Sequence, residues 1–326
     1  MAKGWLRPLP ALALLTACPG TFVAPPSRLA LVAPQPFSAA VVDGFPDGRP
    51  TDPVSAAVFD QINRDRASAG LSPVRWDEKA ASLASDYTRA QIQEGTFGHF
   101  LLDGVPPYAR LSRRGDLGMG TENSAAYIFF GDYVDVPPLK LALDSHRGML
   151  DEAPPNDGHR RAILDPAATH VGVGWSQSGR NFRLAEEFTA RLFDWLKVDR
   201  FGPDGSAITV KGRALSGMQI AFVSVARQDL PSGLSREAVN SRHTYSYPNP
   251  LYALVPAGSG LRAGGLISLR CVTPSVRGRF SFDYIIDEPG LWTFVLYFDR
   301  KGESQARPGA SFTVWVDEEK GPSVPS

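Results

Sequence analysis

The sequence predicts two folded modules, a mixed α/β layer structure followed by an all-β sandwich. Between residues 51 and 195, segments with the apolar spacing of helices alternate with short strand-like segments, without the regular spacing of βαβ units. Between residues 196 and 320, short alternating runs are separated by turns rich in Gly, Pro and Asp, at the roughly 8–12-residue spacing of a β-sandwich. The length of 326 residues, 43% of them hydrophobic, is enough for two domain cores.

The N-terminal residues 1–18 are predicted to be a signal peptide. Lys3 and Arg7 give a basic start, and Ala11–Leu15 form a short apolar centre. The following Leu15-Thr16-Ala17-Cys18 resembles the lipobox of bacterial lipoproteins, in which the cysteine is lipidated. The expectation is export and a lipid anchor on Cys18 at the cell envelope. The alternative is an ordinary secretory signal that leaves the protein extracellular or periplasmic. Residues 19–50, rich in Pro, Ala and Ser, are predicted to be an extended tether.

Charge and cysteine content exclude several classes of protein. The 34 basic and 34 acidic residues leave no net charge, so nucleic acid is not an expected partner. The sequence contains no apolar run of the roughly 18 residues that a transmembrane helix needs, so a lipid would be the only membrane anchor. If Cys18 carries lipid, Cys271 has no disulfide partner, and we expect it to be a small core residue of a strand.

Start and stop signals define the elements of residues 51–195. Asp52 is a capping residue, Pro53 fits the first helical position, and Gly70 ends this first helix. The second helix is predicted from a cap at Asp77 to Gly95. The remaining predicted elements are a crossing segment at Leu71–Trp76, a helix near Leu139–Leu150, a helical turn at His159–Leu164, and strands at Val171–Trp175 and Phe182–Thr189.

Alternating runs in residues 196–320 predict six strands and one large loop. The loop is the Pro-rich stretch Leu230–Pro256. The strands are Ala207–Leu215, Met218–Val225, Leu266–Val272, Arg279–Ile286, Trp292–Phe298 and Ser311–Val316.

Five linked motifs occur in order along residues 53–190. They are Phe59-x-x-Ile62-Asn63-x-x-Arg66 with Gly70-Leu71-x-Pro73-Val74-x-Trp76-Asp77; Phe97-Gly98-His99 followed by Arg110; Glu122-Asn123; Gly158-His159-Arg160-x-x-Ile163-Leu164-x-Pro166; and Val171-Gly172-Val173-Gly174. In this combination the chain resembles the CAP superfamily, which includes the cysteine-rich secretory proteins, venom antigen 5 and the plant pathogenesis-related proteins. Its pattern is nearest to the bacterial, cysteine-poor branch. The resemblance implies a three-layer α-β-α sandwich with a cleft that holds histidine and glutamate side chains.

The resemblance also implies the residues of that cleft, namely His99, Glu122, Asn123 and His159. Two imidazoles and a carboxylate are the donor set of a catalytic zinc site, so zinc or another divalent metal on His99, His159 and Glu122 is an expectation. Many eukaryotic members complete a tetrad with a second glutamate. The matching segment here has no clean equivalent, which leaves His146, Glu152 and Glu186 as candidates for the fourth position.

Glu186 is a candidate because of its strand. Alternation places it on the same face as Phe182, Leu184 and Phe188, where a carboxylate needs a partner or a raised pKa. It would then face the cleft or hold a neighbouring layer. The alternative is an ordinary charge on an edge strand.

Three functions are compatible with these residues. The leading prediction is non-catalytic: the cleft binds a small or extended ligand (lipid, glycan or peptide), with or without a metal, and the β-sandwich is an accessory module. The second is a metal-dependent hydrolase or peptidase, with Glu122 as a metal ligand or general base. The third is a surface adhesion or scaffold protein whose cleft is vestigial. The chain lacks His-Glu-x-x-His, Gly-x-Ser-x-Gly and Cys-x-x-Cys motifs.

Overall fold

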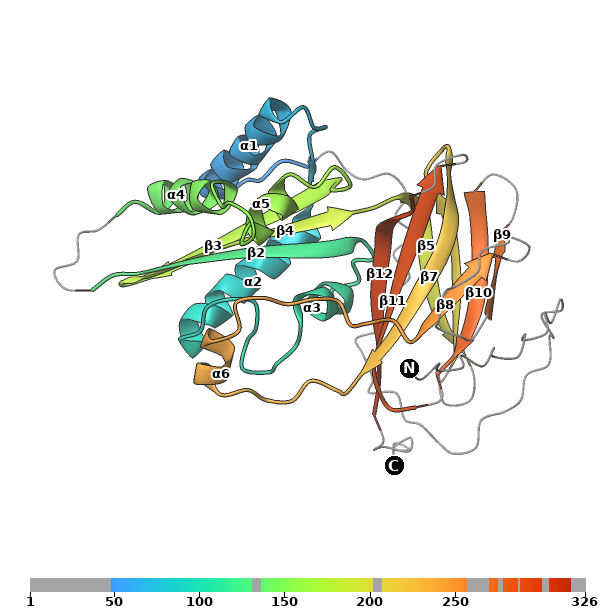
Figure 1. Cartoon of the computed structure of the whole chain (residues 1–326). Coiled ribbons are helices and arrows are strands. Elements are labelled where there is room, and N and C mark those ends of the chain that lie inside the picture. The colour runs from blue at the N-terminus through green and yellow to red at the C-terminus, as the bar shows by residue number, and fades with distance from the viewer. Residues whose placement is uncertain are drawn as a thin grey trace, which may run out of the picture.

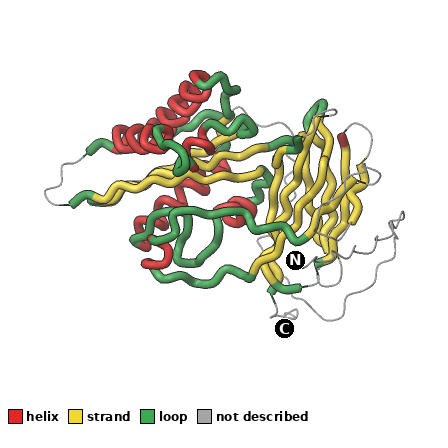
Figure 2. The backbone as a smooth tube through the Cα atoms, viewed as in Figure 1, coloured by secondary structure: helices red, strands yellow, loops and turns green. Residues whose placement is uncertain are grey.

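The computed structural model describes residues 48–130, 136–201, 207–256, 270–274, 278–286, 288–300 and 305–317 (Figures 1 and 2). The predicted signal peptide 1–18 with Cys18, and the predicted tether up to residue 47, lie outside the described residues. Within the described part of the chain, no helix is both long and apolar enough to cross a membrane.

A four-stranded sheet forms the middle layer of the first domain, in the order β1-β3-β4-β2. Only the β1–β3 pair is parallel. Helices α1, α4 and α5 cover one face of this sheet, and α2 and α3 lie on the other (Figure 1). The predicted three-layer α-β-α architecture is therefore confirmed. The bounds are β1 Arg75–Trp76, β2 Met119–Ile128, β3 His170–Ser178, β4 Asn181–Ala190, α1 Pro53–Ser68, α2 Glu78–Glu94, α3 Pro107–Arg113, α4 Pro138–Leu150 and α5 Gly158–Ile163.

The helix ends follow the capping signals of the sequence. The Asp52 side chain accepts a hydrogen bond of 2.7 Å from the backbone N–H of Ser55, and Pro53 occupies the first turn of α1. The Asp77 side chain caps α2, and Gly95 ends that helix in the left-handed conformation at φ 68°. Gly95 therefore determines where α2 ends and where the next loop begins.

Two glycines of β3 allow α2 to lie directly on the sheet. A Cβ atom at Gly172 would stand 2.0 Å from the backbone nitrogen of Ala81, and one at Gly174 would stand 2.2 Å from that of Ser85. No side chain fits in these gaps. The Gly-Val-Gly sequence therefore serves close helix–sheet packing.

The second domain is an eight-stranded sheet in the order β12-β11-β7-β8-β9-β10-β6-β5. Its two halves face each other. Tyr284 of β10 contacts Trp292 and Phe294 of β11, with ring centroids 5.7 and 5.2 Å apart, and Phe280 contacts Phe298 in the same way. The predicted β-sandwich is confirmed. The bounds are β5 Phe193–Phe201, β6 Ala207–Ala214, β7 Met218–Gln228, β8 Tyr252–Pro256, β9 Arg270–Pro274, β10 Arg279–Ile285, β11 Gly290–Arg300 and β12 Arg307–Val316.

Two parts of the second domain differ from the sequence-based expectation. β5 was not predicted as a strand, and it begins at Phe193, before the predicted domain boundary at 196. The stretch Leu230–Pro256 is not one large loop, because it contains the short helix α6 (Arg236–Asn240) and strand β8. We call residues 234–247 the strap. The strap leaves the sandwich and runs along the first domain below β2 (Figure 1).

Candidate functional site

His99 lies in the loop after α2, and the helix itself holds this loop in place. The Tyr87 hydroxyl and the Gln91 side-chain amide, both on α2, donate hydrogen bonds to the carbonyl oxygen of Gly98. Gly98 turns the chain at φ 97°. His99 is thereby directed at β2, where its Nδ1 lies 2.9 Å from Oε1 of Glu122.

The other oxygen of Glu122 is also occupied. Arg110 of α3 donates from Nη2 to Glu122 Oε2 at 2.5 Å, and from Nη1 to the carbonyl oxygens of His99 and Val105. Burial favours a raised pKa for Glu122, but the Arg110 charge and the His99 hydrogen bond outweigh it and lower the pKa. The carboxylate is therefore ionised, and the Nδ1–H of His99 is the donor between them.

A second buried carboxyl group lies beside Glu122. Glu187 pairs with it across β4 and β2 in the sheet ladder. Burial and the neighbouring Glu122 charge raise the pKa of Glu187 well above its usual range. The pair thus carries one negative charge, on Glu122. The sequence alone indicates no role for Glu187, because only the strand register reveals its partner.

His159, at the start of α5, has a carboxylate of its own. Its Nδ1 lies 2.6 Å from Oε1 of Glu152, and its backbone N–H donates to Oε2 of the same residue at 3.0 Å. The ring centroids of His159 and His99 are 6.0 Å apart. Two histidine–glutamate pairs therefore face each other, and within the described residues neither Nε2 atom has a hydrogen-bonding partner.

The three candidates for the fourth position have different partners in the structure. Glu152 contacts His159, whereas His146 and Glu186 bind each other, with His146 Nδ1 2.7 Å from Glu186 Oε1. The other ring nitrogen of His146 contacts Asp65 at 3.0 Å, so both nitrogens are occupied. Burial alone would lower the pKa of His146, but the carboxylates of Glu186 and Asp65 raise it to about 9.

Glu186 is fully buried on β4, an inner strand of the sheet, so its interpretation as an edge-strand charge is wrong. Asn123 connects this interior cluster to the histidine pair. Its side-chain amide donates to the carbonyl oxygen of His159 and to Oε2 of Glu186, each at 3.2 Å. His146 and Glu186 thus support the site from behind.

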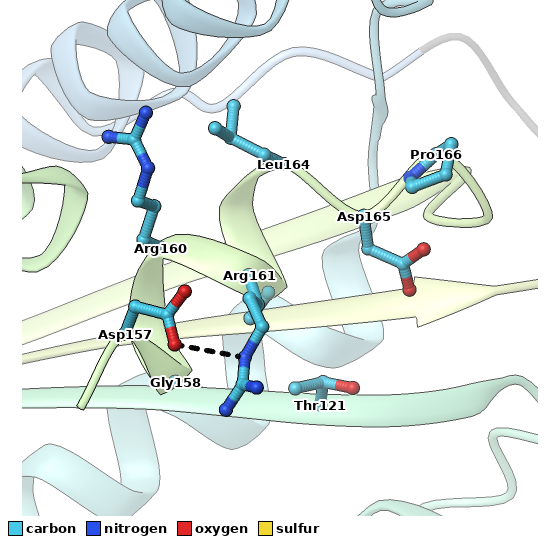
Figure 3. Close-up of a pocket in the computed structure, with 9 residues that line it drawn as sticks. Thr121, Asp157, Gly158, Arg160, Arg161, Leu164, Asp165 and Pro166 are labelled. Atoms are coloured by element: carbon cyan, nitrogen blue, oxygen red, sulfur yellow. Dashed lines mark ion pairs between the residues drawn. The ribbon is translucent and has the colours of Figure 1, made fainter. Parts of the chain in front are cut away.

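A cavity of 510 Å³ lies beside α5 (Figure 3), and neither His99 nor His159 is among its lining residues. Gly158 and Thr121, two of its lining residues, directly precede His159 and Glu122 in the chain. Arg161 extends toward Thr121 and forms an ion pair of 3.4 Å with Asp157. The remaining lining residues are Arg160, Ala162, Leu164, Asp165 and Pro166. The cavity therefore offers charges of both signs next to α5, the helix in which His159 lies.

Tyr245 of the strap is a site residue that sequence analysis missed. Its ring lies against His99 in an edge-on arrangement, with centroids 4.8 Å apart. Its hydroxyl accepts a hydrogen bond of 2.6 Å from the backbone N–H of Glu122. It lies outside the motifs of the first domain, and no sequence signal linked it to them.

The donor set differs from a three-ligand metal site. Among the described residues, no group of three or more His, Cys, Asp and Glu side chains is arranged to hold a metal ion. His99 and His159 can each offer an Nε2 atom, whereas both oxygens of Glu122 are taken by His99 and Arg110. A metal on His99, His159 and Glu122 together stays a prediction that would require Glu122 to leave these partners.

Comparison with known proteins assigns the first domain. The model of the cysteine-rich secretory protein (CAP) family matches residues 59–190. The first domain thus matches the CAP family in sequence over residues 59–190 and has the three-layer fold that the resemblance implied. No curated protein sequence matches the chain.

Several solved structures resemble the chain. They include an extracellular protein containing an SCP domain from Bacillus anthracis (21% identity, TM-score 0.34, 44% of this chain and 45% of that one). An outer surface protein from Borrelia burgdorferi is 17% identical (TM-score 0.36, 44% of this chain and 96% of that one). A cysteine-rich secretory protein from Staphylococcus aureus is 16% identical (TM-score 0.28, 44% and 42%). The chain thus spans less than half the length of the Bacillus protein.

Proposed function

We propose that the first domain is a non-catalytic binding module whose His99 and His159 hold a small polar ligand. The observation that carries this proposal is the pair of facing imidazoles, each fixed through Nδ1 by a glutamate. A carboxylate on Nδ1 sets the tautomer and leaves the Nε2 lone pair available. Two such nitrogens, on rings whose centroids are 6.0 Å apart, can accept hydrogen bonds from one ligand or bind a cation.

A divalent ion such as zinc is a candidate for that position. His99 and His159 would hold it, and the ion would supply positive charge for an anionic group of the ligand. Two protein ligands are fewer than the three of known catalytic zinc sites, so the bound ligand would complete the coordination. We therefore expect metal and ligand to bind cooperatively.

The hydrolase hypothesis has weaker support from the same geometry. It needs Glu122 as a metal ligand or as a general base. Both oxygens of Glu122 are engaged, and the lowered pKa of this carboxyl makes it a weak base near neutral pH. The binding function requires neither role.

The cavity beside α5, whose lining includes the chain neighbours of His159 and Glu122, supports a ligand larger than a single ion. Its 510 Å³ lies within the roughly 300–1,000 Å³ of small-molecule sites. Charges of both signs in its lining favour a ligand with polar groups along its length. We further propose that the protein is exported, on the basis of the predicted signal peptide 1–18.

Zinc titration of the full chain by calorimetry tests this proposal. We expect stoichiometric binding that falls at least about tenfold when His99→Ala or His159→Ala removes one of the two nitrogens. His243→Ala is the matched control, because His243 stacks on Phe97 and belongs to neither pair. Binding that survives both substitutions would place the metal elsewhere. If the folded wild type binds no zinc, the metal-assisted form of the proposal is wrong.

A ligand that needs no metal is detected separately. Imidazole ¹⁵N resonances report directly on Nε2, and small-molecule mixtures that contain carboxylates, sugars and peptides serve as probes. We expect a true ligand to shift the Nε2 resonances of both His99 and His159. Shifts that are confined to other histidines would count against the site.

A further inference from the structure

The connection between β7 and β8 is far longer than the sandwich requires. These strands are antiparallel neighbours, and two to five residues are enough to join such a pair. The connection spans residues 229–251, which is 23 residues. Apart from the five-residue helix α6 it contains no helix or strand, and loops longer than about 12–15 residues without such elements are uncommon in compact domains and usually functional. The excess length takes the strap to the first domain and back.

The strap is bound to the first domain along its whole course. The backbone N–H of Leu234 donates to the carbonyl oxygen of Leu102 at 2.8 Å, and Arg236 Nε donates to that of Glu94 at 2.7 Å. The Asn240 side chain accepts a bond from the backbone N–H of Phe97. These contacts follow the loop that ends two residues later at His99. The strap therefore fixes the segment that carries one half of the histidine pair.

Beyond this loop, the strap reaches the edge of the sheet. β2 is an edge strand, so alternate N–H groups point away from the ladder and need partners. The hydroxyl of Tyr245 accepts from Glu122 N, and that of Tyr247 accepts from Gly120 N, at 2.6 and 3.3 Å. Two tyrosines spaced two residues apart thus match two outward N–H groups with the same spacing.

Tyr245 also covers His99. The His99 side chain is 7% exposed, whereas that of His159 is 27% exposed. The ring of Tyr245 lies on His99, so the site opens on the side of His159. A ligand that reaches both Nε2 atoms has to enter from that side.

We propose that Tyr245 is a positioning residue of the candidate site, so that the second domain completes the site of the first. Its ring closes the His99 side and its hydroxyl holds the β2 edge at Glu122. The proposal rests on the proposed function only in taking the histidine pair as the site. It assigns a role in ligand selection to a residue outside the CAP-matched region: Tyr245 excludes ligands that would have to lie across His99.

Chemical modification of the full chain with diethyl pyrocarbonate tests whether the Tyr245 ring shields His99 from solvent. In the wild type, we expect His99 to react about fourfold more slowly than His159, in proportion to their exposures. Tyr245→Ala should bring the two rates together, whereas Tyr245→Phe, which keeps the ring, should not. Tyr247→Phe is the matched control, because its hydroxyl bonds Gly120 and Ser311. Near-ultraviolet circular dichroism verifies that each variant is folded.

Amide hydrogen exchange of the wild type provides a test that needs no ring-deleting variant. The backbone N–H groups of Glu122 and Ala126 both point away from the sheet ladder at the edge of β2, and we expect the Glu122 amide to exchange more slowly than that of Ala126. Tyr245→Phe should remove that difference.

Equal exchange of the two amides in the wild type would overturn the proposal, as would an unchanged His99 rate in folded Tyr245→Ala. Failure to bind zinc or any small ligand would instead count against the proposed function, and it would leave both of these readouts intact.

Discussion

His146 is predicted to titrate near pH 9 and to make the first domain less stable in alkali. Glu186 and Asp65 hold its two ring nitrogens and raise its pKa from 6.5 to about 9. The raised value means that the protonated ring stabilises the folded state. This contribution is complete below pH 6.5 and is lost as the pH rises through 9. A difference of about 2.5 pKa units corresponds to roughly 3 kcal/mol of unfolding free energy.

Two measurements check this prediction. An NMR titration of the His146 ring should give a pKa near 9 directly. Urea unfolding between pH 6 and 9.5, followed by tryptophan fluorescence, should show the loss of about 3 kcal/mol. The His146→Gln variant cannot titrate at this position, so it should be less stable at neutral pH and should lack the alkaline decrease.

A His146 ring that titrates near 6.5 in the folded protein would refute this prediction. The prediction also fails if the wild type and His146→Gln lose stability in parallel between pH 6.5 and 9. Either result would mean that the two carboxylates do not hold the ring in its charged form.

Three further substitutions test the surroundings of the site. Arg110→Met should cost about 3–5 kcal/mol of unfolding free energy, because it leaves the buried Glu122 charge uncompensated; thermal melting checks this. Gly172→Ala should lower the melting temperature by several degrees, because its Cβ meets the α2 backbone and the strain exceeds about 1 kcal/mol. Glu152→Gln should leave the protein folded, with a stability change of about 1 kcal/mol, but weaken zinc binding roughly tenfold or more through His159; calorimetry beside wild type would refute this by showing equal affinity.

The sequence was sufficient to predict the scaffold of the first domain. Caps at Asp52 and Asp77 and the terminating glycine at position 95 are local signals, and each acts on residues within one helical turn. The resemblance of the histidine and glutamate motifs to those of the CAP superfamily then implied which segments converge. The capping signals are present in the chain itself, because local geometry requires particular residue types at particular positions.

The partner of His159 could not be chosen from the sequence. Glu152 lies seven residues before His159, across the turn between α4 and α5, and the path of that turn decides whether they meet. The sequence left His146, Glu152 and Glu186 as candidates for the fourth position of the cleft. The structure shows His146 and Glu186 bound to each other, which depends on how α4 packs against β4, a long-range feature without a local signal.

The role of Glu187 depended on register. Strand alternation correctly placed Glu186 on the apolar face, so Glu187 had to face the opposite layer. Glu187 lies opposite Glu122 only because of the register in which β4 pairs with β2. A shift of that register by one residue would separate the two side chains. A sequence without known pairing cannot provide this information.

The strap shows why the boundary of a family domain need not be the boundary of a site. The CAP-matched residues end at 190. A fragment that ended there would expose the N–H groups of Gly120 and Glu122 on the edge strand β2. It would also remove Tyr247, whose ring stacks on Tyr108. An exposed strand edge is prone to pair with other chains, so a fragment cut at the matched boundary carries that risk. The strap removes the risk with tyrosine hydroxyls, and the same residues place a ring on His99. Protection of the edge and closure of the site are thus one structural solution, which is why the ligand must be sought with the full chain.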